Sequence, residues 1–122
     1  MKINKVELGI EEDILTIEIN NMTSKRCNIV PNQYEVKIIT KHNSYYAFYS
    51  YNSFILSYKN GILNRVGKNY NYSATTGKYR NMFTGMTLKD LESCMKNKNF
   101  IYDETLQVYK NKKKILEIYI KV

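Results

Sequence analysis

The sequence predicts an α+β fold: a mostly antiparallel, twisted sheet of about six or seven strands with one main helix packed on it. Several segments alternate apolar and polar residues with the period of two that strands show. One Asn-Gly pair, at residues 60–61, favours a tight hairpin turn. A single segment near residue 90 has the apolar spacing and the capping residues of a helix. The 122 residues suit one core, so we expect a single domain, residues 1–122.

The first half of the chain is predicted to consist mainly of strands. Residues 14–20 alternate, with Leu15, Ile17 and Ile19 on one face, and residues 3–9 are a candidate partner strand. Residues 20–32 are polar and contain a proline, which predicts a loop. Strands are then expected at residues 34–40, 45–51, 54–59 and 62–66. A bulge or a short helical turn is expected near residues 52–53, and the Asn-Gly turn joins the last two strands.

The second half contains the predicted helix. Residues 67–85 lack clean periodicity and carry small polar residues, which predicts an ordered, functional loop. Thr87 can cap a helix, and Asp90 three residues later can favour its dipole. Leu88, Leu91 and Met95 can then face the core, and residues 97–99 end the helix. Residues 105–110 and 113–122 are expected to form a final hairpin.

The charge is concentrated in the middle of the chain. The formal net charge is +8. Residues 36–89 contain no Asp or Glu, and their basic residues are Lys37, Lys41, Lys59, Arg65, Lys68, Lys78, Arg80 and Lys89. Most of the tyrosines lie in the same segment. Cations neutralise phosphate and aromatic rings stack on bases, so a contiguous face of this kind would suit nucleic acid or another anionic partner. The structural alternative is that tyrosines fill a sheet face and lysines cover the solvent side of strands.

Residues 72–81, Tyr-Ser-Ala-Thr-Thr-Gly-Lys-Tyr-Arg-Asn, are the most distinctive string. They resemble the Tyr-Ser-x-Thr-Thr-Gly/Ser-Lys-His-x-Asn signature of a small domain of unknown function that recurs in proteins of bacteriophages, plasmids and their hosts. The resemblance covers about residues 34–86 and includes the tyrosine-rich segment 45–52. Tyr79 stands where that family commonly has His. The resemblance implies a phage or mobile-element context and no particular mechanism.

The side chains of this string suit phosphate binding. Hydroxyls can bond to phosphate oxygens or to the backbone, a glycine at 77 allows a positive φ or a close approach, and Arg80 can clamp a phosphate with two hydrogen bonds. In the alternative reading the string is a structural loop whose polar groups bond only the backbone. It is not a P-loop, because the earlier glycine is missing and Tyr79 follows the lysine. The candidate binding residues are Lys59, Arg65, Lys68, Tyr70, Tyr72, Ser73, Thr75, Thr76, Lys78, Tyr79, Arg80 and Asn81.

No catalytic apparatus is recognisable. His42 is the only histidine and lies in a turn-like segment, while Cys27 and Cys94 lack a partner spacing and are expected to be free thiols. The carboxylates have no matching His set, so we expect no metal site, no cofactor and no enzyme activity. No segment resembles a signal peptide, and no apolar run approaches the roughly 20 residues of a membrane helix. We therefore expect a protein of the bacterial cytoplasm with no membrane partner.

The expected function is binding. A non-enzymatic, small, basic protein of a phage or mobile element would engage nucleic acid or a host nucleoprotein complex, with an acidic protein surface as the other anionic partner that the charge allows. Two alternatives remain open. One is an inhibitor of a host defence system that binds protein directly, as an anti-CRISPR protein does. The other is a structural module of a larger assembly.

Overall fold

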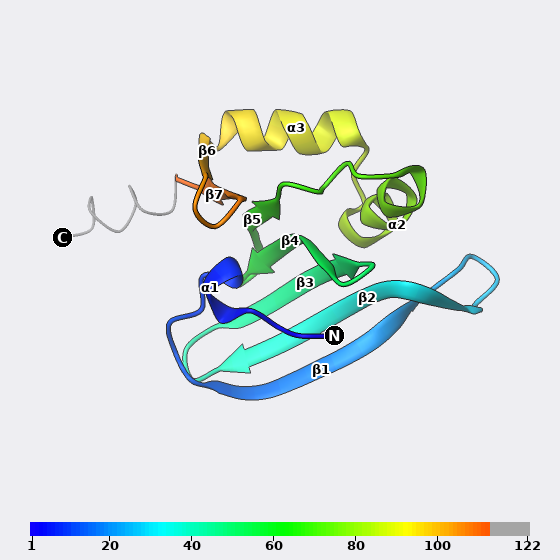
Figure 1. Ribbon diagram of the computed structural model, residues 1–122, viewed down its shortest axis with the longest axis horizontal. Helices are drawn as coiled ribbons and strands as arrows, with labels where there is room; N and C mark the ends of the chain where they lie inside the picture. The colour runs from blue at the N-terminus through cyan, green and yellow to red at the C-terminus, as the bar shows by residue number, and fades with distance from the viewer. Residues whose placement is uncertain (113–122) are drawn as a thin grey trace.

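The computed structural model describes residues 1–112, in which seven strands form one antiparallel sheet (Figure 1). The strand order is β1-β2-β3-β4-β5-β7-β6, and each pair of neighbours is antiparallel. The predicted antiparallel sheet of six or seven strands is thus confirmed. The strands are β1 (Ile14–Thr23), β2 (Ile29–Thr40), β3 (Ser44–Ser50), β4 (Ser53–Lys59), β5 (Ile62–Gly67), β6 (Phe100–Asp103) and β7 (Val108–Asn111).

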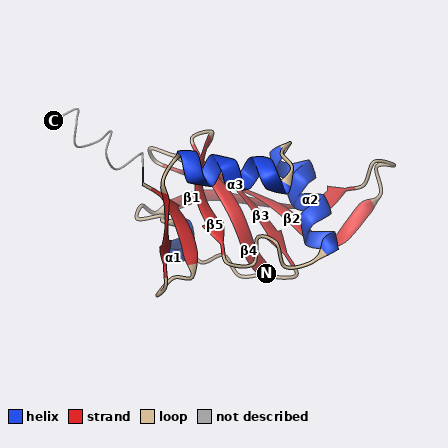
Figure 2. Ribbon diagram, turned by 90° about the horizontal axis from the view of Figure 1, so that it is seen from above, coloured by secondary structure: helices blue, strands red, loops and turns tan. Residues whose placement is uncertain are grey.

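Helices cover both faces of this sheet. The described helices are α1 (Lys5–Leu8), α2 (Ala74–Thr84) and α3 (Leu88–Asn97). The two longer ones, α2 and α3, lie on the same face (Figure 2) and bury Tyr79, Leu91 and Met95 against the sheet. The short α1 packs on the opposite face through Leu8. No helix within residues 1–112 is long and apolar enough to cross a membrane.

The alternation of side chains along the central strands fills both core layers. One layer lies under α1 and contains Leu8, Ile10, Val36, Ile38, Tyr45, Ala47, Tyr49, Phe54 and Val108. The other lies under α2 and α3 and contains Met22, Phe48, Ile55, Leu56, Leu63, Val66, Tyr79, Leu91 and Met95. Strand β3 contributes to both layers, because successive residues of a strand point to opposite faces. Its tyrosines and phenylalanine are therefore mostly core residues.

Two tight turns connect the central strands. The predicted Asn-Gly turn is confirmed: Asn60 and Gly61 have φ of 50° and 81° between β4 and β5. Between β3 and β4, Tyr51 and Asn52 adopt the same left-handed conformation, with φ of 50° and 65°. There is no helical turn at residues 52–53, but the register between β3 and β4 shifts close by, between the pairs Phe48–Leu56 and Tyr49–Phe54, as the alternative of a bulge predicts. A bulky aromatic residue rarely adopts a positive φ, so Tyr51 is an unusual turn residue.

Two predictions are wrong in the first part of the chain. Residues 3–9 are not a strand: Asn4 Oδ1 accepts a hydrogen bond from Val6 N at 3.0 Å and caps α1, which ends at Gly9 with φ of 73°. The predicted loop 20–32 shrinks to residues 24–28, since β1 and β2 extend into it. Pro31 is accommodated because it lies where the register between β1 and β2 shifts.

The expectation of one main helix is also incomplete. The predicted loop 67–85 contains α2, which is 11 residues long beside 10 for α3. The inward face of α2 includes Thr76 and Arg80, two polar residues, so no apolar period marks it. Residues 97–99 end α3 as predicted. Strand β7 falls in the predicted hairpin but pairs with β5 and with the unpredicted β6. The predicted strand 113–122 lies outside the described residues.

Candidate functional site

The distinctive string of residues 72–81 forms the start of α2 and joins this helix to the sheet. Ser73 is the N-cap, and its Oγ accepts a hydrogen bond from Thr76 N at 3.1 Å. Thr76 is fully buried, and its Oγ1 lies 2.9 Å from Ser50 Oγ at the end of β3. A chain of three hydroxyls, Ser50, Thr76 and Ser73, therefore fixes the first turn of α2 against the end of β3.

Arg80 is a buried structural residue in this site. Its side chain is only 2% exposed. Nη1 donates to Tyr70 O at 2.6 Å, and Nη2 donates to Asn81 Oδ1 at 2.9 Å. Burial lowers the pKa of Arg80, while nearby Glu92 and Tyr70 oppose that shift. The guanidinium thus holds the segment between β5 and α2 in place and does not reach the surface, where a phosphate could meet it.

Tyr70 is part of the same internal network. Its hydroxyl donates to Glu92 Oε2 at 2.6 Å, and its ring meets the ring of Tyr109 edge-on with centroids 6.0 Å apart. Burial and the bond to Glu92 raise the pKa of Tyr70 to about 12. Tyr79 is buried as well. The loop before α2 is thus held from inside by Arg80 and Tyr70, which leaves other side chains of this region facing solvent.

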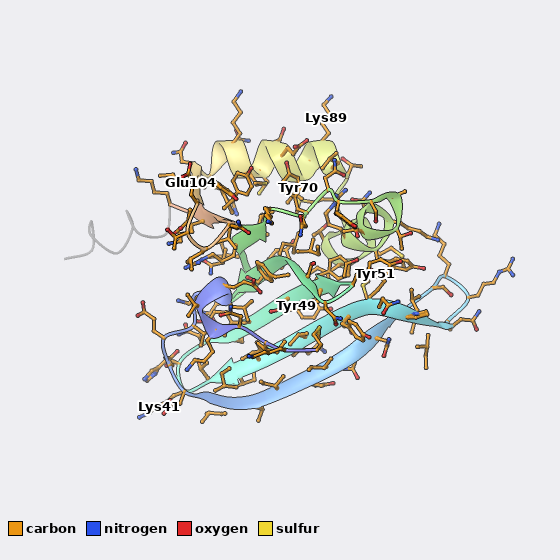
Figure 3. All side chains as sticks on the ribbon, viewed as in Figure 1. Lys41, Tyr49, Tyr51, Tyr70, Lys89 and Glu104 are labelled. Atoms are coloured by element: carbon orange, nitrogen blue, oxygen red, sulfur yellow. The ribbon has the colours of Figure 1, made fainter. Side chains whose placement is uncertain are left out.

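The solvent-facing side chains gather at one end of the sheet. Tyr72 is 70% exposed and Tyr51 is 50% exposed. Each tyrosine is one residue away from an end of the hydroxyl chain, Tyr51 next to Ser50 and Tyr72 next to Ser73. Figure 3 shows Tyr51 beside α2. We define the sheet-end surface as Tyr51, Asn52, Lys68, Tyr72, Thr75 and Lys78, all of them exposed.

Electrostatics distinguish this surface from the rest of the protein. Two of its members are lysines, and residues 36–89, which supply all of them, contain no carboxylate. The first turn of α2 also has no acidic residue, so its dipole is not offset locally. Two acidic groups lie nearby. Glu7 of α1 lines a depression of about 230 Å³ together with Asn52 and Lys68, and Glu92 of α3 accepts the hydrogen bond from Tyr70. Lys68 is therefore at the border of the surface.

Lys59 lies at the opposite end of the strands, and Arg65 lies within β5, where it pairs with Ser57. Strand β4 runs from Ser53, beside the sheet-end surface, to Lys59, and its length puts roughly 20 Å between the two ends. Lys59 and Arg65 line a separate pocket with Glu11 and Glu12. Figure 3 shows Lys41 at this far end, away from Tyr51. The cations of the carboxylate-free segment therefore do not form one contiguous face.

The candidate residues thus divide into four groups. The sheet-end surface contains Lys68, Tyr72, Thr75 and Lys78, and Ser73 caps the helix behind it. The buried group is Thr76, Tyr79 and Arg80. The internal network holds Tyr70 and Asn81, and the far pocket holds Lys59 and Arg65. Sequence reasoning missed Tyr51, although a tyrosine directly before Asn-Ser between two strand patterns was a signal of a tight turn with an exposed ring.

Neither metal ligands nor a disulfide occur at this surface. Within residues 1–112, no three His, Cys, Asp or Glu side chains come together in a way that could hold a metal ion. Cys27 lies exposed in the β1–β2 connection and Cys94 lies half-buried on α3, and both are free thiols. The groups that the sheet-end surface offers to a ligand are rings, hydroxyls, amides and ammonium groups.

Fold and site together define a small, mostly β domain with an aromatic and basic surface at one end of its sheet. The chain belongs to a family of unknown function (DUF8033), whose model matches residues 17–101, more than half of the chain. This range contains the string 72–81 and the entire sheet-end surface. No curated protein and no solved structure matches the chain significantly.

Proposed function

We propose that this protein is a non-enzymatic binding protein that engages single-stranded nucleic acid through the sheet-end surface. The observation that carries the proposal is the pair of exposed rings, Tyr51 and Tyr72, beside exposed Lys68 and Lys78 on a segment without carboxylates. The resemblance to phage and mobile-element domains is compatible with this role, and we place the protein in that context as part of the proposal.

The chemistry of the surface favours single strands over duplexes. An unpaired base offers its face to a tyrosine ring, and such stacking contributes about 1–3 kcal/mol per base. A lysine ammonium beside the ring can neutralise the phosphate that follows, which releases counterions and makes binding depend on salt. Hydroxyl and amide groups of Thr75 and Asn52 can bond to sugar or phosphate oxygens. None of these contacts requires a particular base, so we expect weak sequence preference.

The backbone of Tyr51 supports a functional role for its ring. The left-handed conformation at φ of 50° is costly for a bulky residue, and Asn, Asp or Gly would fit this turn better. Tyr51 is half exposed, so burial of its ring offsets little of this conformational cost. A tyrosine in this position is understandable if the ring is needed for contact with a ligand.

Fluorescence anisotropy with a labelled oligothymidylate tests the proposal. Tyr72→Ala should weaken binding by about 1–3 kcal/mol, roughly five- to 150-fold in Kd. Lys78→Ala should lower the slope of log Kd against log salt by about 0.7, the value for one phosphate of a single strand. Tyr51→Asn should weaken binding and at the same time stabilise the fold by up to about 1 kcal/mol, because asparagine adopts the left-handed turn conformation with less strain.

Matched controls remove the same groups elsewhere. Tyr102→Ala deletes an exposed ring on β6, and Lys96→Ala deletes an exposed cation on α3. Both should bind as the unmodified protein does. The sheet-end surface is not the site if binding does not depend on the salt concentration. The same conclusion follows if the surface variants and the control variants lose affinity equally. If no oligonucleotide binds, and a host protein is retained after nuclease treatment, the direct-inhibitor alternative would replace this proposal.

A further inference from the structure

The pocket at the other end of the strands contains two cations, Arg65 and Lys59, that form no ion pair within residues 1–112. It has a volume of about 480 Å³ and is lined by side chains from both ends of the sequence, among them Glu12, Tyr45, Lys59, Arg65 and Lys110. The three basic residues come from neighbouring strands, since β4, β5 and β7 are adjacent and Arg65 pairs with Lys110. They point to the face that α1 covers, because Lys59 pairs with Tyr45 of that core layer.

Arg65 is the central residue of this pocket. Its Nη1 is buried and has no hydrogen-bond partner, and within the described residues the guanidinium forms no ion pair. Asp103, at the end of β6, does not pair with Arg65. It forms an ion pair with Lys110, whose Nζ lies 2.6 Å from Asp103 Oδ2. Burial lowers the pKa of Arg65, yet an arginine remains charged at any physiological pH. A half-buried cation with an unused donor is costly unless an anion meets it.

The main chain holds this guanidinium in place. Gly9, directly after α1, lies against it, and a Cβ at Gly9 would be 2.5 Å from Arg65 Nη2. Only a glycine allows this approach, and Gly9 also has the positive φ that ends α1. Contact with Gly9 therefore restricts the guanidinium before any ligand binds, which lowers the entropic cost of binding.

Glu11 and Asp103 act on Arg65 electrostatically, but no carboxylate within the described residues forms an ion pair with it. Glu12 is held by neutral donors, with Oε1 accepting from Thr40 Oγ1 at 2.7 Å and from Asn43 Nδ2 at 2.6 Å. These bonds lower the pKa of Glu12, so it is ionised and fixed in the wall. Lys59 Nζ lies 5.8 Å from the ring centroid of Tyr45 and has no carboxylate within ion-pair distance among the described residues. Glu11 is exposed at the rim.

We infer that this pocket binds a small oxyanion, a phosphate or carboxylate group, between Arg65 and Lys59. Arg65 supplies a guanidinium with an unused donor and Lys59 supplies a mobile ammonium group, and both groups bind oxyanions. Glu11 at the rim and Glu12 in the wall select against highly charged anions, so a group with one or two charges fits best. This site is separate from the sheet-end surface and goes beyond the proposed function.

Calorimetric titration with inorganic phosphate and, separately, with acetate tests the inference at constant ionic strength. Phosphate or acetate should bind saturably, and the two titrations show which oxyanion the pocket prefers. Arg65→Gln should weaken binding at least about tenfold, because it removes the charge-assisted hydrogen bonds. Glu11→Gln should strengthen binding, because it removes a competing carboxylate. Lys78→Ala, on the sheet-end surface, should leave anion binding unchanged.

Several results would overturn this inference. One is an effect of phosphate that is equal in the unmodified protein and in Arg65→Gln, which would be a general salt effect. Another is the absence of saturable binding by either anion. If Arg65→Gln does not fold, Lys59→Gln takes its place, and unchanged affinity in that variant contradicts the site. Oligonucleotide binding measured on Lys59→Gln should stay unchanged, so a failure here and a failure of the proposed function are distinguishable.

Discussion

Two glycines of this protein should respond to the same substitution with opposite signs. Gly9 has φ of 73°, and a Cβ there would collide with Arg65. Gly77 is in the middle of α2 without a positive φ, and a Cβ there would meet Arg80 Nη2 at 3.6 Å, an ordinary contact. The expectation that the glycine at 77 serves a positive φ is therefore wrong, and alanine fits that position.

We predict that Gly77→Ala stabilises the protein by about 0.5–1 kcal/mol, because alanine loses less backbone entropy in a helix. Gly9→Ala should destabilise it by more than about 1 kcal/mol, because strain and the displaced guanidinium add. Urea denaturation of both variants measures the two free energies of unfolding. A stability change of the same sign at both positions would contradict the described backbone.

At the level of single residues, the sequence shows which groups are present but not which way they point. Arg80 and Lys78 are two positions apart and both read as phosphate ligands in the sequence. The helix turns Arg80 into the core, where it bonds Tyr70 O, and leaves Lys78 in solvent. Because helical phase is fixed by tertiary packing, this difference depends on α2 and could not be predicted from the string alone.

The two longer helices show which elements a sequence can reveal. Helix α3 is apparent because it has a capping box and an apolar stripe: Thr87 Oγ1 accepts from Asp90 N at 3.2 Å, and Leu91 and Met95 are buried. Helix α2 has an N-cap but buries Thr76 and Arg80, so its inward face looks polar. Its position depends on bonds to Ser50 and Tyr70, which are distant in sequence.

The capping box of α3 should contribute measurably to the stability of the protein. Thr87→Ala removes the acceptor for Asp90 N and should cost about 1 kcal/mol of stability. Ser93→Ala, at an exposed position of the same helix, should change stability by less than about 0.5 kcal/mol. Thermal or urea unfolding measures the stability of both variants. Equal stability of the two variants would mean that the cap contributes nothing and that packing alone holds the start of α3.

The whole molecule carries several tyrosines whose protonated form is favoured by the fold. Burial raises the pKa of Tyr49, and burial with a hydrogen bond to Glu35 raises that of Tyr46. The pKa of Tyr70, which bonds Glu92, is raised to about 12. The unfolded chain releases these protons near pH 10, so the stability that they provide is complete below about pH 10 and is lost as the pH rises further.

We therefore predict that the free energy of unfolding falls between about pH 10 and pH 12. Urea midpoints measured across this range show the decline. Tyr46→Phe should lessen it, because phenylalanine has no proton to release, and the hydroxyl of Tyr46 donates to Glu35 Oε2 at 2.5 Å in the folded state. Stability that stays constant to pH 12, or a decline that Tyr46→Phe leaves unchanged, would contradict this assignment.

On the scale of the molecule, local patterns predict the antiparallel sheet well and the distribution of its charges poorly. Alternation and the Asn-Gly turn are local signals, and they identify the central hairpins. The division of the cations between two ends of the sheet depends on strand direction and register, since Lys59 and Lys68 are nine positions apart but lie at opposite ends. A count of charges along the chain cannot show this separation.

NMR titration with a short oligothymidylate, followed through the amide chemical shifts, directly tests whether the sheet-end surface binds nucleic acid. We expect the largest shifts on Tyr51, Lys68, Tyr72, Thr75 and Lys78, and we expect them to shrink as salt is added. Residues around Lys59 and Arg65 should stay unchanged. Shifts centred on that pocket, or no shifts at low salt, would contradict the assignment of the sheet-end surface to nucleic acid.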